Sequence, residues 1–476
     1  MNLPRPPTQR CANGQRIGAA GALRAQPAGM SAARALYSLL TWCAQPLLRR
    51  KLRRRAVAEP AYAQAMDERF GRYPAAAIDR LLAPGGSAGR LVWLHAVSLG
   101  ETRAAAVLLE RLREQLPGMR LLLTHGTATG RAEGEKLLRS GDLQVWQPWD
   151  TPGAVARFLR SFRPAVGVLL DTEVWPNLVA GCRRHGVPLV LANARLSEKS
   201  LRRAQRLAAL ARPAYGALSA VWAQTGEDAA RLRCLGAEVR GVLGNLKFDL
   251  LPNAEQLAQG RAWRAQTGRP VLMLASSREG EEALWLEHFQ KARAHPAADA
   301  GQAADVQWLI VPRHPQRFDA VQQLFERAGL SVSRRSAWAA LPEPADLWLG
   351  DSLGEMALYY GLADAALLGG SFAPLGGQNL IEAAACGCPV LLGPHTFNFA
   401  QAAELACAAG AAQRVAHMAA GMALATQWVH DAAQQGAASA RATRFAGAHR
   451  GAAQATAQAI AAIVQSAPAP PGKPMR

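Results

Sequence analysis

What this 476-residue chain lacks excludes several kinds of protein. Its apolar segment near the start, residues 35–48 (ALYSLLTWCAQPLL), contains Pro46 and is shorter than the about 20 residues that cross a bilayer. No GxGxxG motif follows residues 91–97, and no GxxxxGKS/T motif occurs anywhere. The sequence therefore predicts neither a spanning helix at this position, nor a standard dinucleotide site, nor a P-loop.

Cysteines are few and have no paired spacing. They are scattered at positions 11, 43, 182, 234, 386, 388 and 407. Cys386 and Cys388 stand too close together and too isolated for a four-ligand zinc site. We therefore expect free, buried thiols and a reducing compartment.

Acidic residues are also scarce relative to basic ones. The chain has 54 Lys and Arg against 35 Asp and Glu, a formal net charge of +19. Such an excess suggests an anionic partner: a membrane surface, a phosphorylated ligand or nucleic acid. Nucleic acid is disfavoured because the basic residues cluster beside an apolar segment rather than among aromatic side chains.

The basic cluster lies directly after the apolar segment. Residues 49–55 read RRKLRRR, and each cation gains about 1 kcal/mol beside anionic lipid. Residues 35–55 are thus predicted to lie on a membrane surface, and a solvated basic helix face is the alternative. Residues 1–34 are expected to be a disordered extension, with Met30 as an alternative start.

From residue 91 onward, short β-type runs alternate with helix-length segments, which predicts parallel sheets with helices on both faces. The expected strands lie within 91–97, 120–126, 143–148, 165–173, 187–193, 219–224, 237–244, 270–276, 306–312, 345–351, 365–371 and 388–394. The pattern restarts after 251–269. It predicts two doubly wound domains, 56–250 and 270–465, a linker at 251–269 and a disordered tail at 466–476. Ligands are expected in a cleft between the domains, beyond the carboxyl ends of the strands.

Three acids follow strands of the first predicted domain. Glu101 stands at the first turn of a helix, where the helix dipole is expected to lower its carboxyl pKa and keep it ionised, as a general base requires. The alternative is an ordinary charge at a helix start. Asp171 and Glu173 are expected on one face of a continuing strand, where they would bind a divalent metal or orient a sugar hydroxyl.

Cations and glycines follow other strands. Asn193, Arg195 and Lys247 come after strands, where the two cations would neutralise an anionic substrate or serve as ordinary loop charges. In the second predicted domain, ASSREGEE (275–282) forms a strand-to-helix turn able to receive phosphate. VPRHP (311–315) places cations at the next strand end. The glycine-rich stretch 369–394 allows close approach of a ligand.

Several stretches of the chain occur together in one known family. They are HAVSLGE (95–101), TEVWPN (172–177), NARLSEKS (193–200), GNLKFD (244–249), SREGEE (277–282), VPRHPQRF (311–318) and GGSFAPLGGQNLIEAAACGCPVLLGPHTFNF (369–399). The set resembles the 3-deoxy-D-manno-octulosonic acid (Kdo) transferases of lipopolysaccharide assembly. The resemblance runs from about Leu36 to the C-terminal segments and includes ERFGRYP (68–74).

The resemblance implies an α/β fold of two Rossmann-like domains facing a cleft, the GT-B architecture, with an N-terminal membrane-associating segment. The N-terminal domain would bind the acceptor and the C-terminal domain the nucleotide sugar. The implied activity is inverting transfer of Kdo from CMP-Kdo to a lipid A precursor (lipid IVA), with no metal and no cofactor. The enzyme would lie on the cytoplasmic face of the inner membrane.

The resemblance also implies roles for individual residues. Glu101 matches the family's glutamate in the HAxSxGE motif, which implies that it is the general base, with Glu173 as a second catalytic residue. Where the family commonly has Glu-Thr-Glu before Trp-Pro, this chain has Asp171 as the first acid. Donor-binding roles are implied for Lys247, Ser277, Arg278, Arg313, His314, Glu355, Met356, Gly370, Ser371, Asn379 and Glu382, and acceptor-binding roles for Ser98, Gly100 and Arg195.

Two alternatives remain open at this point. One is another GT-B transferase or an epimerase that uses a UDP-sugar. The other is a non-catalytic protein that binds a membrane surface, which would explain the charge and the apolar segment.

Overall fold

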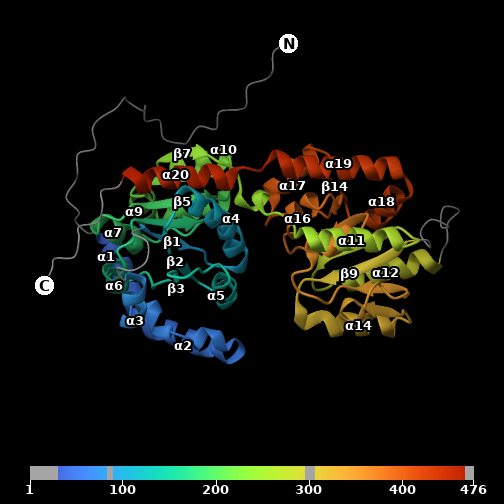
Figure 1. Ribbon diagram of the computed structural model, residues 1–476, viewed down its shortest axis with the longest axis horizontal. Helices are drawn as coiled ribbons and strands as arrows, with labels where there is room; N and C mark the ends of the chain where they lie inside the picture. Colours follow the sequence, from blue (N-terminus) through green and yellow to red (C-terminus); the bar gives the residue numbers. More distant parts are fainter. Residues whose placement is uncertain (1–30, 83–88, 295–305, 467–476) are drawn as a thin grey trace, which may run out of the picture. The chain divides into compact units, whose positions relative to one another are not determined.

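The chain forms two compact units, Met1–Leu246 with Gly451–Arg476, and Lys247–Arg450. The computed structural model describes residues 31–82, 89–294 and 306–466. Each unit is built on one seven-stranded parallel sheet (Figure 1). The prediction of two doubly wound α/β domains is confirmed. Of the expected extension 1–34 and the expected tail 466–476, residues 1–30 and 467–476 lie outside the described residues.

The first sheet has the strand order β3-β2-β1-β4-β5-β6-β7. Its strands are β1 (Leu91–His95), β2 (Arg120–His125), β3 (Leu143–Trp146), β4 (Val166–Leu170), β5 (Leu189–Ala194), β6 (Ala220–Ala223) and β7 (Val239–Val242). Each lies within a predicted stretch, except that β5 continues one residue beyond 187–193. The order reverses between the neighbours β1 and β4. In sheets of this kind, ligands bind at the carboxyl ends of the strands where the order reverses.

Helices cover both faces of the first sheet, because apolar side chains of its strands point to both. On one face Trp93 packs with Phe158, and on the other Leu94 packs with Leu108. The helices are α3 (Ala75–Leu82), α4 (Leu99–Gln115), α5 (Ala128–Glu135), α6 (Pro152–Phe162), α7 (Pro176–Arg184), α8 (Glu198–Arg206), α9 (Ala208–Tyr215) and α10 (Gly226–Cys234). Short 3-10 turns, η1 (Pro60–Ala63) and η2 (Met66–Phe70), precede α3.

The second sheet repeats the design with the order β10-β11-β9-β8-β12-β13-β14, which reverses between β8 and β12. Its strands are β8 (Val271–Ser277), β9 (Gln307–Pro312), β10 (Val332–Arg334), β11 (Leu347–Leu349), β12 (Ala365–Leu368), β13 (Val390–Leu392) and β14 (Ala412–Arg414). The sequence did not predict β10 and β14. Both are three-residue strands whose polar and charged residues do not form an apolar run.

The helices of the second unit include one where a linker was expected. They are α11 (Ala254–Gln266), α12 (Glu281–Ala294), α14 (Phe318–Arg327), α15 (Met356–Leu362), α16 (Leu380–Ala385), α17 (Ala400–Ala408), α18 (Met418–His430) and α19 (Ala432–Ala448), with 3-10 turns η3 (Leu246–Asp249), η4 (Pro315–Arg317) and η5 (Arg335–Ala337). The expected linker 251–269 largely forms α11. This helix packs so closely on α15 that a Cβ at Gly260 would lie 2.1 Å from the Leu358 carbonyl oxygen.

The last helix returns to the first unit. The second domain was expected to run to residue 465, but α20 (Ala452–Ser466) belongs to the first unit and packs against α4. Its Ala453, Ile460 and Val464 are buried with Leu108 of α4. The apolar face of α20 thus completes one face of the first sheet.

Two helices form the predicted membrane-associating segment. They are α1 (Ala32–Cys43) and α2 (Gln45–Ala58), so helix begins three residues before the predicted segment. On α1 the side chains of Leu36, Leu39, Leu40 and Trp42 are 57–64% exposed. Across the three described ranges, no helix has both the length and the apolar character needed to cross a membrane.

The cysteines of the described ranges are free, as predicted, but not all are buried. Cys182, Cys386 and Cys388 are buried, whereas Cys43 is exposed. Burial raises the pKa of the Cys182 thiol to about 12, so it is protonated at neutral pH. Cys11 lies outside the described residues.

Candidate active site

Glu101 is held by a hydrogen-bonded turn that follows β1. Ser98 is the N-cap of α4, and its hydroxyl accepts the Glu101 backbone N–H at 3.4 Å. The Glu101 carboxylate accepts the Ser98 hydroxyl at 3.0 Å and the Val97 N–H at 2.9 Å. This Ser-x-x-Glu arrangement resembles a capping box, except that the acid accepts the N–H of Val97, the residue before the N-cap, and it fixes the acid in place.

The pKa of Glu101 differs from the expectation. Burial of the side chain raises it to about 7, and the negative charges of Asp171 and Glu173 add to the rise. The hydrogen bonds from Val97 and Ser98 act in the opposite direction but are outweighed. The prediction of a lowered pKa was therefore wrong, because desolvation exceeds the stabilisation at the helix start. A carboxyl with a pKa near 7 is well matched to proton transfer at neutral pH.

Asp171 and Glu173 occupy a loop, residues 171–175, which we term the acid loop. β4 ends at Leu170, and Asp171 has φ +58°, the left-handed region that breaks the strand. The expectation that both acids share one face of a continuing strand was wrong. The buried Asp171 carboxylate instead accepts the Asn193 amide at 2.6 Å, and the Arg195 guanidinium lies 3.6 Å from it.

Glu173 points to the other end of the acid loop. Its carboxylate accepts the Trp175 indole N–H at 2.9 Å. Burial raises its pKa, and the negative charge of Asp171 raises it further. Because Asp171 and Glu173 both act electrostatically on Glu101, the structure brings the three predicted acids together where β1 and β4 end.

The predicted acceptor-binding residues surround this cluster. Ser98 caps the helix, and Gly100 is exposed, with no atom within 4 Å of the place where a Cβ would stand. Arg195 is exposed but already pairs with Asp171. The turn of α4 thus leaves open space one residue before Glu101.

In the second unit, a carboxylate fills the place expected to receive phosphate. The Glu281 side chain, which is fully buried, accepts backbone N–H groups of Arg278, Gly370, Phe372 and Ala373 at 2.6–3.2 Å. Burial raises its pKa, and these hydrogen bonds oppose the rise. Glu281 was not among the residues assigned from the sequence. The feature of the sequence that could have indicated its role is that an acid stands within the turn predicted to bind an anion.

The neighbouring Glu282 joins two strand ends. Arg317 donates two hydrogen bonds to its carboxylate, at 2.7 and 2.8 Å, and the Ser277 hydroxyl donates a third at 2.7 Å. Ser277, predicted to bind the donor, is therefore a buried side chain committed to Glu282. Bidentate pairs of this kind fix geometry as well as charge.

Positive charge gathers beyond the ends of β8 and β9. Arg313 is exposed, and His314 follows it. Partial burial lowers the pKa of His314, and the charges of Arg278 and Arg313 lower it further. The structure thus brings these three predicted donor-binding residues together at one edge of the sheet.

The remaining predicted donor-binding residues occupy nearby turns. Gly370 has φ +69°, and Ser371 is buried with its hydroxyl accepting the Gly393 N–H at 2.9 Å. Asn379 is the N-cap of α16 and accepts the Ile381 N–H at 3.2 Å, while Glu382 lies in the first turn. The Lys247 ammonium lies 5.1 Å from the centre of the Phe399 ring.

Glu355 and Met356 stand where α15 begins. The Glu355 carboxylate pairs with Arg335 at 2.9 Å and accepts the hydroxyl of Ser352. The Met356 sulfur lies 3.9 Å from the hydroxyl of Ser276, the second-last residue of β8. These contacts link α15 to the end of β8.

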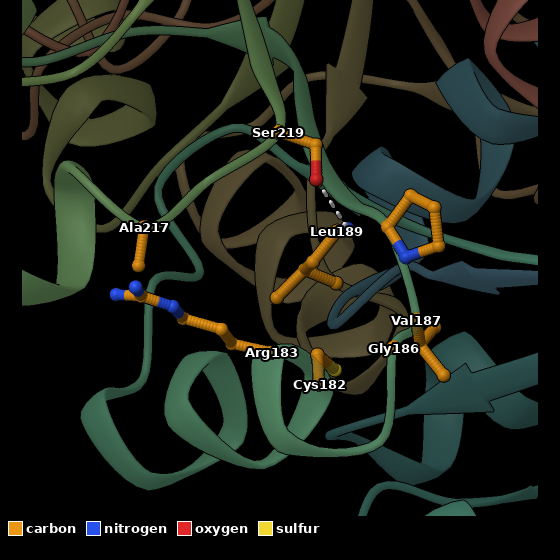
Figure 2. A pocket seen from close by; sticks show the side chains of 8 residues that line it. Cys182, Arg183, Gly186, Val187, Leu189, Ala217 and Ser219 are labelled. Atoms are coloured by element: carbon orange, nitrogen blue, oxygen red, sulfur yellow. Dashed lines mark hydrogen bonds between the residues drawn. The ribbon is translucent and has the colours of Figure 1, made fainter. Parts of the chain in front are cut away.

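A pocket of about 240 Å³ lies elsewhere in the first unit (Figure 2). Its lining includes Cys182, Arg183 and Val187, together with Leu189 at the start of β5 and Ser219 just before β6. Ser219 accepts the Leu189 N–H at 3.2 Å, drawn in Figure 2. Because parallel strands begin at one edge and end at the other, this pocket lies at the edge opposite the three acids. Its one thiol is protonated, and we do not assign it to the active site.

The acidic side chains also bear on whether the protein could hold a metal ion. Within residues 31–82, 89–294 and 306–466, no three or more His, Cys, Asp or Glu side chains are grouped so that they could hold a metal ion. The metal alternative for Asp171 and Glu173 thus gains no support from the described residues.

Comparison with known sequences gives consistent matches. A family model described as 3-Deoxy-D-manno-octulosonic-acid transferase (kdotransferase) matches residues 64–250. The 3-deoxy-D-manno-octulosonic acid transferase of Bordetella pertussis is 49% identical over 82% of this chain and 90% of its own length. The protein of the same name from Haemophilus influenzae is 33% identical over 77% and 83%.

Comparison with solved structures supports the fold. UDP-GlcNAc 2-epimerase from Neisseria meningitidis aligns with a TM-score of 0.52 and 15% identity over 79% of this chain and 99% of that one. A glycosyltransferase from Rickettsia africae aligns with a TM-score of 0.53 and 12% identity over 80% and 99%. These likenesses confirm the GT-B type of fold, with two Rossmann-like domains, and carry no argument about the substrate.

Proposed function

Because the chain belongs to the 3-deoxy-D-manno-octulosonic acid (Kdo) transferase family, we propose that it transfers Kdo from CMP-Kdo to a lipid A precursor, lipid IVA. The proposed reaction inverts the anomeric carbon and uses Glu101 as its general base. The observation that supports this role best is the fixed, half-buried Glu101 carboxylate with a pKa of about 7. Such a group takes up a proton readily from an attacking hydroxyl.

In the proposed mechanism the first unit binds the acceptor. The Glu101 carboxylate removes the proton of the acceptor hydroxyl as its oxygen attacks the anomeric carbon of Kdo, and the bond to the CMP phosphate breaks. Glu173 is the second catalytic acid. Its charge raises the pKa of Glu101, and its carboxylate orients the acceptor hydroxyl. Gly100 leaves room for the acceptor beside the base.

The second unit would receive the leaving CMP. Negative charge develops on the phosphate as the bond breaks, so preorganised cations lower the barrier. Arg278 and Arg313 supply positive charge at the ends of β8 and β9, and His314, whose lowered pKa leaves it neutral at neutral pH, adds a ring N–H donor. The N–H groups of the glycine-rich turn are occupied by Glu281. We therefore assign the phosphate to the cations rather than to those backbone groups.

We also propose that α1 and α2 hold the enzyme against the cytoplasmic face of the inner membrane. The exposed leucines and Trp42 of α1 provide apolar surface, and the arginines of α2 provide positive charge. An amphipathic helix of this kind lies in the interface and is attracted to anionic lipid. The acylated acceptor would thus be met at the surface where it resides.

Turnover of CMP-Kdo with a tetraacylated lipid A precursor, with EDTA present, tests the proposal. Wild type is compared with Glu101→Gln, and loss of the base is expected to lower the rate about 10²–10⁴-fold. A folded mutant as fast as the wild type would remove Glu101 from the mechanism. Turnover only with a UDP-sugar, or no turnover by a folded wild type, would support one of the two alternatives instead.

A further inference from the structure

The acid loop ends where α7 begins, and the start of α7 depends on a distant carboxylate. Trp175 is the N-cap of α7 but provides no side-chain cap. The Asp150 carboxylate, from the segment between β3 and α6, accepts the N–H groups of Asn177 at 3.0 Å and Leu178 at 2.7 Å. Helix N–H groups in the first turn need such partners, and a negative charge there is favourable.

Helix α1 reaches the same place. Burial raises the pKa of the Tyr37 hydroxyl, and the negative charge of the neighbouring Asp150 carboxylate raises it further. The Ser38 hydroxyl is within hydrogen-bonding distance of two acceptors, the Asn177 amide oxygen at 2.9 Å and the Arg34 carbonyl oxygen. Asn177 in turn donates its amide N–H to the Asp150 carbonyl at 2.8 Å.

This network is buried, so its members depend on one another. Ser38, Asp150 and Asn177 are 8%, 7% and 3% exposed. Water does not replace a partner that is lost at such a depth, and a buried carboxylate missing one hydrogen bond is costly. Removing a hydroxyl from α1 is therefore expected to loosen the start of α7.

The start of α7 in turn determines where Glu173 lies. Trp175 belongs to the helix start, and its indole N–H holds the Glu173 carboxylate at 2.9 Å. Only Val174 stands between these two residues. A shift of α7 thus moves the acid that acts on Glu101.

We propose that α1 positions the acid loop. Tyr37 and Ser38, acting through Asp150 and Asn177, hold the start of α7 and with it the Glu173 carboxylate. The same helix carries Leu39 and Leu40 on its exposed surface. The exposed surface of α1 therefore attaches the protein to the membrane, and its buried surface positions the acid loop. These two functions are separable. The catalytic consequence rests on the proposed function.

The test separates the two surfaces of α1. The inward variant combines Tyr37→Phe with Ser38→Ala, and the matched outward variant combines Leu39→Ser with Leu40→Ser. Kdo transfer is measured with the acceptor dispersed in detergent, and binding is measured on vesicles containing anionic lipid. We expect the inward variant to lose about tenfold in kcat, since small displacements in an active site cost up to about 10²-fold. Its acceptor KM and vesicle binding should be unchanged.

The outward variant should show the reverse, with weaker vesicle binding and wild-type kcat in detergent. Hydrogen–deuterium exchange at the Asn177 and Leu178 amides gives a second readout, and it should be faster in the inward variant only. A wild-type kcat or unchanged exchange in that variant overturns the proposal, as does an equal loss of kcat in the outward variant. If the wild type transfers no Kdo, the proposed function fails, while the exchange measurement still decides whether α1 holds α7.

Discussion

The Glu281 carboxylate lies 2.6 Å from the backbone nitrogen of Gly370, although 89 residues separate the two along the chain. Through this bond and those to Phe372 and Ala373, the first turn of α12 fixes the glycine-rich turn after β12. The donor side of the proposed site is thus shaped by an internal anion. Its geometry is set before a nucleotide arrives.

Replacing this anion is expected to weaken both the fold and donor binding. In Glu281→Gln the amide NH₂ is a donor and cannot accept hydrogen bonds from the backbone N–H groups that it faces. The free energy of unfolding should therefore fall by about 2–4 kcal/mol. The KM for CMP-Kdo should rise at least several-fold. Urea unfolding and donor kinetics measure these effects. Glu287→Gln, an exposed position on the same helix, is the control and should change neither. Equal stability of both variants would contradict the assigned role.

The pH dependence of the reaction should report the raised pKa of Glu101. The base must be ionised, so kcat/KM should fall as the pH drops below about 7, the pKa of the folded protein, rather than below its ordinary value of 4.5. Folding stability should respond in the opposite sense. The folded state retains a proton that the unfolded state has lost between these values, so stability falls as the pH rises through them. An acid limb near 4.5 would contradict the assignment.

Asp171 and Glu173 should each change the pH below which kcat/KM falls, which we term the acid limb, but by different amounts. The charge of Asp171 raises the pKa of Glu101 more than that of Glu173 does. Asp171→Asn is therefore expected to shift the acid limb to lower pH by more than Glu173→Gln. Profiles of kcat/KM against pH for the two variants measure this order. Identical limbs in both variants and in the wild type would show that the acids do not act on Glu101.

Two glycine substitutions should have contrasting effects. A Cβ at Gly100 meets no atom within 4 Å, and alanine is favoured over glycine in a helix by up to about 1 kcal/mol. Gly100→Ala should therefore fold with equal or greater stability, yet turn over more slowly if the acceptor approaches this turn. Gly369→Ala places a Cβ 2.3 Å from the Ser276 carbonyl oxygen and should be destabilised. Full activity of Gly100→Ala would show that the acceptor does not bind in the space beside Gly100.

The arginines of α2 should not contribute equally to membrane binding. Arg49 lies over the Phe70 ring at 3.9 Å, and Arg55, although exposed, lies over the Tyr62 ring at 4.3 Å, so both make contacts with aromatic rings of the protein. Arg50, Arg53 and Arg54 are exposed. Changing these three arginines to glutamine should lower the affinity for anionic vesicles. It should also make that affinity less dependent on salt concentration. Changing Arg49 and Arg55 should mainly reduce thermal stability, and equal loss of vesicle binding in both sets would contradict this division.

Much of the fold could be predicted from the sequence, because strands buried on both faces form apolar runs. Each of the twelve predicted stretches overlaps a strand. The carboxyl ends of β1 and β4 bring Glu101, Asp171 and Glu173 together. The pKa of Glu101 was predicted in the wrong direction. The helix start is visible locally, whereas the burial that dominates comes from segments distant in sequence.

Other features required the folded chain for the same reason. The partners of Glu281 come from a turn far along the chain, and nothing in SREGEE indicates them. Asp150 precedes α6 without any motif, and its role at α7 depends on Tyr37 from the N-terminal helix. The left-handed backbone at Asp171 was likewise hidden, since an apolar run before a polar residue does not mark where a strand stops.

The position of α20 has a consequence for how the protein is made. This helix supplies Ala453, Ile460 and Val464 to the apolar layer over one face of the first sheet, yet it is the last described helix of the chain. On the ribosome, all of Lys247–Arg450 emerges before it. The first unit therefore keeps that face uncovered until the whole second unit has been synthesised, so the final burial of its core depends on translation of both units.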